Sequence, residues 1–134
     1  MKLTFVIPAY NEEVLIADCL RSVLLEIERS GRSADADVVV VDNASTDRTG
    51  EIARGFAGVR VVDQPEKGIV HARDAGFHAT DSELVANIDA DTIVPPGWLD
   101  TVFAEFDRDA ELVALSGPYH YYDLSRPKQL VVAG

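Results

Sequence analysis

The chain has 134 residues, of which 47% are hydrophobic and 26% charged. These values are typical of one globular domain, and they exclude disordered, collagen-like and low-complexity classes. The net charge of −11, from 12 basic and 23 acidic residues, would repel a phosphate backbone, so we expect no nucleic-acid partner.

Cysteine usage and hydropathy bear on the location of the protein. Cys19 is the only cysteine, so no internal disulfide can form. The chain starts with Met-Lys-Leu-Thr and leads into a strand-like run rather than a signal peptide. The longest aliphatic run, 38–41, is far shorter than the roughly 20 apolar residues of a membrane helix. We therefore predict a cytoplasmic chain without a transmembrane segment, or one peripheral to a membrane within a longer protein.

The first predicted element is a strand over residues 3–7. It should stop at Pro8, which has no N–H group for a ladder. An amphipathic helix of about five turns should follow, with Asn11 as its cap and Gly31 at its other end. Its apolar residues recur at helical spacing: Ile16, Leu20, Val23, Leu24 and Ile27.

The middle of the chain alternates strands and helices. The apolar run 38–41 lacks alternation, which is typical of a central parallel strand covered on both faces, and Asp42 should end it. A short helix is expected over 47–56 and a strand over 59–62. Another helix should run from Gly68 to about residue 78.

The last elements carry an acidic turn and then lose regularity. A predicted strand over 84–88 runs directly into Asp-Ala-Asp, and Pro96 suits the first position of the next helix. A fifth strand is expected over 112–115. The regular alternation predicts right-handed crossovers and a mostly parallel, three-layer α/β sheet. Because no terminating signal closes the final residues, we expect the chain to be truncated at its C-terminus.

Ligands of open parallel sheets bind outside the carboxyl ends of the strands. Polar residues gather after four of the predicted strands. These segments are 8–12, 42–47, 64–68 and 89–91. Acidic groups, amides and one lysine should therefore share one crevice.

Paired carboxylates two residues apart can hold a hard divalent cation such as Mn²⁺ or Mg²⁺. Three such Asp-x-Asp triplets occur, where chance would supply on the order of one. They are Asp35/Asp37, Asp89/Asp91 and Asp107/Asp109. Only Asp89/Asp91 follows a predicted strand, although an Asx turn before Pro95 explains its spacing equally well.

Two further residues have both a functional and a structural interpretation. Asp42 could accept hydrogen bonds from a nucleobase, but its position favours the capping of the next turn. Arg73 could reach a diphosphate as a charged donor, or form a surface salt bridge.

Four segments in this order resemble the family 2 inverting glycosyltransferases of the GT-A fold. They are Val-Ile-Pro-Ala-Tyr-Asn-Glu at 6–12, Val-Val-Asp-Asn-Ala-Ser-Thr-Asp-Arg-Thr at 40–49, Lys-Gly at 67–68 with Ala-Arg-Asp-Ala-Gly at 72–76, and Ile-Asp-Ala-Asp at 88–91. Their order makes the match specific. Asp74 stands where the family usually has Asn. The resemblance implies a Rossmann-like GT-A α/β/α sandwich in which residues 1–134 form a donor-binding domain that lacks the C-terminal acceptor portion.

The resemblance also implies a site for a nucleoside-diphosphate sugar and a divalent metal. The expected sugar-nucleotide residues are Pro8, Ala9, Tyr10, Glu12, Asp42, Lys67, Gly68, Arg73 and Asp89. Asp89 is expected nearer the ribose and Asp91 as the main metal ligand. The acceptor would be a hydroxyl of a glycan, a lipid or another molecule.

The catalytic base of such a transferase is not identified. In the family it lies well beyond position 134, and Asp123 and His120 are conceivable substitutes. A non-catalytic nucleotide-sugar binding or interaction module is therefore an alternative. A nucleotidyltransferase is a further one, but it would require a Gly-rich, basic loop after the first strand, which residues 8–12 do not provide.

Overall fold

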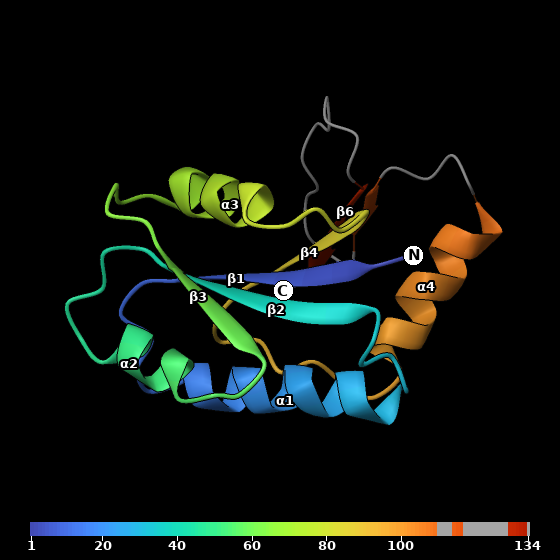
Figure 1. Ribbon diagram of the computed structural model, residues 1–134, viewed down its shortest axis with the longest axis horizontal. Helices are drawn as coiled ribbons and strands as arrows, with labels where there is room; N and C mark the ends of the chain where they lie inside the picture. Colours follow the sequence, from blue (N-terminus) through green and yellow to red (C-terminus); the bar gives the residue numbers. More distant parts are fainter. Residues whose placement is uncertain (110–113, 117–128, 134) are drawn as a thin grey trace.

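A computed structural model describes residues 1–109, 114–116 and 129–133, with side chains for 1–109 (Figure 1). Strands and helices alternate along most of its length. The elements are β1 Leu3–Ala9, α1 Ile16–Arg29, β2 Ala36–Asp42, α2 Thr49–Arg54, β3 Val59–Asp63, α3 Ile69–His78, β4 Leu84–Ile88, α4 Trp98–Arg108, β5 Ala114–Ser116 and β6 Gln129–Ala133.

The strands form one sheet in the order β3-β2-β1-β4-β6-β5, and its described pairs are all parallel. Figure 1 shows α3 on one face of the sheet and α1 and α2 on the other. The predicted three-layer α/β architecture with a mostly parallel sheet is therefore confirmed. The final segment, which was not predicted as a strand, forms β6 between β4 and β5.

Two apolar layers fill the space between the sheet and its helices. The larger layer joins α1 and α4 to one face, and the smaller one joins α3 to the other. Each central strand contributes to both layers, which explains the unbroken apolar run of β2. At Gly76 of α3 an added Cβ would lie 2.2 Å from the Val6 side chain, so the glycine permits the close approach of helix and sheet.

The prediction that Pro8 stops the first strand is wrong, because β1 continues to Ala9. Alternate residues of a parallel strand bond to opposite neighbours. Ala9 bonds toward β2, where its carbonyl accepts from the Asn43 N–H at 2.9 Å. Pro8 therefore faces β4, whose pairing with β1 ends at Val6, so its missing N–H breaks no ladder bond.

Asn11 does not cap α1, which is another correction to the predicted elements. The helix begins at Ile16 and has 14 residues, about four turns. Asn11 has a φ of 50°, and its side-chain carbonyl accepts from the Thr46 N–H at 2.8 Å. It thus joins the loops after β1 and β2. Gly31 does close the helix as predicted, with a φ of 72°.

Two more helices begin later than predicted. α4 starts at Trp98 behind Gly97, which has a φ of 90°, so Pro96 lies outside the helix. α2 starts at Thr49 because the Asp47 carboxylate accepts from the Thr49 N–H at 2.9 Å and fixes a turn before it. In the described part of the chain, no helix combines the length and the apolar character that a bilayer crossing requires.

Candidate functional site

A cavity of about 440 Å³ opens at the carboxyl ends of β1 and β4, beside the start of α3. Most of the predicted site residues meet there, although their segments are far apart in the sequence. The described lining residues are Pro8, Ala9, Tyr10, Glu12, Asn43, Lys67, Gly68, Ile69, Ala72, Asp89, Ala90 and Asp91. Asp42 and Arg73 are not among these lining residues.

Lys67 and Tyr10 close one side of the cavity. The Lys67 Nζ donates to the Tyr10 hydroxyl at 2.9 Å and lies 4.1 Å from the centre of its ring. The face of the Tyr10 ring therefore attracts the Lys67 ammonium, while the Tyr10 hydroxyl accepts a hydrogen bond from it. Among the described lining residues Lys67 is the only basic one, and it shares the cavity with the acidic residues Glu12, Asp89 and Asp91.

Asn43, which the sequence analysis did not include as a site residue, holds the loop that carries Lys67. Its side chain is buried and donates to the carbonyls of Gln64 at 3.0 Å and Glu66 at 2.8 Å. Its own carbonyl accepts from the Gly68 N–H at 2.9 Å. The available signal was an amide directly after a strand-ending acid, a position where side chains often bond to backbone.

Gly68 is the cap residue before α3 and has a backbone conformation that favours glycine. Its φ of 139° lies in the region that L side chains rarely adopt. The residue thus turns the chain from the Asn43-held loop into the helix. This places the backbone of the helix start on the cavity.

Asp89 and Asp91 form the acidic wall of the cavity. Ala90 between them is 4% exposed and packs into the core, whereas both acids are exposed. The Thr92 N–H donates to the Asp89 carbonyl at 2.9 Å and closes a tight turn through the main chain. Both aspartates of this turn line the cavity, whereas Ala90 does so from a nearly buried position.

The acidic groups repel one another across the cavity. Burial raises the pKa of Glu12, and the charges of Asp91, Asp47 and Asp89 raise it further. Beneath them the Cys19 thiol donates to the Asp89 carbonyl at 3.7 Å. Burial, together with the charges of the nearby acids, raises the pKa of this thiol to about 12.

The donor set of this wall fits a cation that is shared with a phosphate group. Within the described residues no group of three His, Cys, Asp or Glu could hold a metal ion. Asp89 and Asp91 provide two carboxylates, and Mg²⁺ is commonly held by one or two carboxylates together with substrate phosphates and water. A cation here would also offset the charges of Asp91, Asp47 and Asp89 that, after burial, help to raise the pKa of Glu12.

Asp42 shows the capping contact that its position favoured. Its carboxylate accepts from the Ser45 N–H at 3.2 Å, and an added Cβ at Gly50 would lie 2.4 Å from it. The side chain thus lies against α2. Arg73 places Nη2 4.0 Å from the Asp89 carboxylate, and burial lowers the pKa of its guanidinium. Arg73 therefore forms an ion pair with an aspartate that lines the cavity.

The other two Asp-x-Asp triplets lie away from this cavity. Asp35 and Asp37 are at the amino end of β2, where Asp37 accepts from the Thr4 hydroxyl at 2.5 Å. Asp107 and Asp109 are at the end of α4. The tertiary structure therefore separates three patterns that look alike in the sequence.

A parallel α/β sheet with its cavity at the carboxyl ends of the strands defines the Rossmann-like class of fold. Residues 4–131 match the family model of Glycosyl transferase family 2. The chain therefore belongs to the family 2 glycosyltransferases, which have the GT-A fold.

Similar proteins agree with this assignment. The uncharacterized glycosyltransferase Rv0539 of Mycobacterium tuberculosis is 39% identical over 110 residues, which cover 82% of this chain and 46% of that protein. The structure of S. aureus TarS 1-349 in complex with UDP has a TM-score of 0.76 and 26% identity, over 87% of this chain and 35% of that one.

A third similar protein was solved with a metal. The mannosyltransferase PcManGT from Pyrobaculum calidifontis, in complex with GDP-Man and Mn²⁺, has a TM-score of 0.64 and 32% identity, over 70% of this chain and 28% of that one. The chain spans less than half the length of the curated relatives that it matches.

Proposed function

We propose that this chain is the donor-binding domain of an inverting glycosyltransferase. It binds a nucleoside-diphosphate sugar together with Mn²⁺ or Mg²⁺, for transfer of the sugar to a hydroxyl of a glycan, a lipid or another acceptor. The observation that carries the proposal is the 440 Å³ cavity that Asp89, Asp91, Lys67 and Tyr10 line together. Support comes from TarS, solved with UDP, and from PcManGT, solved with GDP-Man and Mn²⁺.

The residues divide the binding between two walls. Asp89 and Asp91 would hold the cation, which offsets the negative charge that builds on a departing diphosphate. Lys67, which lines the same cavity, offers an ammonium to the same diphosphate. Asn43 and Gly68 keep that lysine in place through their shared hydrogen bond.

The proposal treats residues 1–134 as one donor-binding unit and assigns none of the described carboxylates as the general base. Glu12, Asp89 and Asp91 all belong to the donor wall. His120 and Asp123, the conceivable substitutes named above, lie outside the described residues.

Titration calorimetry tests the proposal directly. UDP, GDP, UDP-GlcNAc and GDP-Man are titrated into the chain with Mn²⁺, with Mg²⁺ and with a chelator. We expect binding of at least one of them only when metal is present, because the acidic wall repels a bare diphosphate. Equal affinity with chelator would contradict the metal assignment, and no binding of any of the four would contradict the donor assignment.

A further inference from the structure

The segment that carries the acidic pair, residues 89–99, is attached mainly to helix α1. Pro95 and Pro96 have no N–H groups. Of the four N–H groups that remain between Val94 and Leu99, one donates to a carbonyl within the segment. The other three donate to side chains of α1.

Glu26 makes two of these attachments. Its side chain is fully buried, and its carboxylate accepts from the N–H groups of Gly97 at 3.2 Å and Leu99 at 2.8 Å. These groups begin α4, whose cap residue Gly97 makes no side-chain hydrogen bond. Glu26 therefore supplies the missing N-terminal cap from another helix, where a negative charge is favourable.

The charge of Glu26 is balanced within the same contact. The half-exposed Arg29 donates to Glu26 at 2.7 Å and to Asp100 of α4 at 2.8 Å. Burial alone would raise the pKa of Glu26, but hydrogen bonds from Arg29, Leu99 and Gly97 together lower it. The carboxylate is thus ionised at neutral pH and ties α1 to the first turn of α4.

Two further side chains of α1 continue the attachment toward the acids. The Ser22 hydroxyl accepts from the Val94 N–H at 2.9 Å. One turn earlier the Cys19 thiol donates to the Asp89 carbonyl at 3.7 Å. Positions 19, 22 and 26 follow the i, i+3, i+7 spacing that places side chains on one helix face. One face of α1 thus contacts the acidic segment at its start, middle and end. The helix itself lies below the sheet in Figure 1.

We propose that Cys19, Ser22 and Glu26 are positioning residues that set the placement of Asp89 and Asp91 for a cation-bound diphosphate. This inference rests on the proposed function. The two acids are exposed and receive their geometry from the backbone that carries them, so contacts that fix this backbone fix the carboxylates. Loss of contacts that orient metal ligands typically costs about 10–100-fold in metal affinity.

The experiment compares three variants of the chain. Glu26→Gln keeps one acceptor oxygen but removes the charge and presents an amide NH2, itself a donor, to one of the two N–H groups. Ser22→Ala removes a single, half-buried acceptor and is the milder change. Glu28→Gln is the matched control, since it removes the same charge from an exposed position of the same helix.

Three quantities are measured for each variant: Tm, hydrogen exchange of the amides in 89–99, and the affinity for UDP or GDP with Mn²⁺. We expect faster exchange in this segment for both Glu26→Gln and Ser22→Ala. At temperatures well below Tm, affinity should fall about tenfold for Glu26→Gln and less for Ser22→Ala. Glu28→Gln should match the wild type in all three.

The outcomes separate this inference from the function on which it rests. Unchanged exchange in 89–99, or faster exchange with unchanged affinity, would overturn the positioning role and leave the proposed function standing. A wild-type chain that binds neither nucleotide with Mn²⁺ would overturn both. Should Glu26→Gln fail to fold, Ser22→Ala decides the question by the same two readouts.

Discussion

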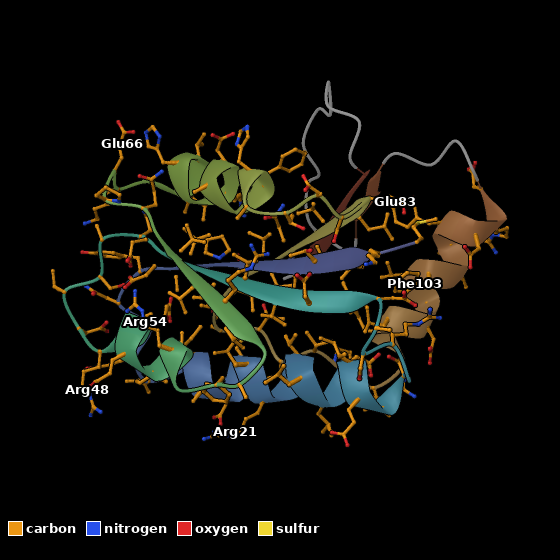
Figure 2. All side chains as sticks on the ribbon, viewed as in Figure 1. Arg21, Arg48, Arg54, Glu66, Glu83 and Phe103 are labelled. Carbon is orange, nitrogen blue, oxygen red and sulfur yellow. The ribbon has the colours of Figure 1, made fainter. Side chains whose placement is uncertain are left out.

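The two ends of the sheet carry cavities of similar size and the same excess of acidic lining residues, but their charged groups make different contacts. The one at the amino ends, about 470 Å³, is lined among others by Asp35, Asp37, Arg60 and Glu83. Figure 2 shows Glu83 at that end of the molecule and Glu66 at the other. Among the described lining residues, acidic groups outnumber basic ones by two in both cavities. Neither volume nor net charge distinguishes them.

The difference lies in how the charges are compensated. At the amino end Asp37 accepts from Thr4 and lies 3.6 Å from Arg60, which in turn donates to the Ala79 carbonyl at 2.7 Å. At the carboxyl end burial raises the pKa of Glu12, and the charges of Asp91, Asp47 and Asp89 raise it further. Polar groups that only stabilise the fold are satisfied within it, whereas a binding site keeps like charges facing one another for a ligand to neutralise.

The largest expected effect on nucleotide binding comes from a comparison in which one aspartate at each end of the sheet is replaced by alanine. Asp91→Ala should weaken metal-dependent nucleotide binding by at least about 100-fold, more than a change outside the ligand set. Asp37→Ala should change this affinity by no more than about twofold, because the Asp37 carboxylate instead accepts a hydrogen bond from Thr4 and lies beside Arg60. Asp109→Ala, at the end of α4, is a second control. Calorimetry with Mn²⁺ measures all three, and a similar loss in either control would show that the wrong triplet was chosen.

A second pair of variants separates stability from binding. Asn43→Ala removes three hydrogen bonds at the carboxyl end, and Thr4→Val removes a buried hydroxyl that contacts Asp37, Thr80 and Ser82. Each should cost about 2 kcal/mol in the free energy of unfolding, because buried partners lose their hydrogen bonds.

Only Asn43→Ala should also weaken nucleotide binding, since it releases the loop that carries Lys67. Urea denaturation and calorimetry on the same samples provide the two measurements. If Thr4→Val lost as much free energy of nucleotide binding as it loses in free energy of unfolding, the distinction between the two ends would not hold.

The smallest effect concerns the pH dependence of stability. Because the pKa of Glu12 is raised in the folded chain, its favourable contribution is present below its unfolded pKa and is lost as pH rises through the folded value. Glu12→Gln should therefore raise Tm at pH 7 without metal, by on the order of 2 °C. The gain should vanish below about pH 4, where the carboxyl is protonated in both states. Thermal melts across pH, with Glu28→Gln as control, would contradict this if Glu12→Gln were neutral or destabilising at pH 7.

Local pattern was enough to predict the layers and the end of the sheet that carries the cavity. The apolar run of β2 and the helical spacing of α1 each report which faces are buried, and burial follows from residue type. The rule that parallel strands share a carboxyl edge then predicts that Tyr10, Lys67 and Asp89 lie in one crevice. These inferences depend on periodicity and chain order, which the sequence contains directly.

Boundaries and buried polar contacts were decided by the tertiary structure. Pro8 lies within β1 because of where β4 stops pairing, and Asn11 contacts Thr46 instead of capping a helix. Glu26 sits on the apolar side of α1 and caps α4 from 73 residues away. These contacts could not be predicted because their donors and acceptors lie far apart in the sequence. A side chain's hydrogen-bonding capacity is set by its chemistry, but the N–H that it reaches is fixed only when distant segments pack together.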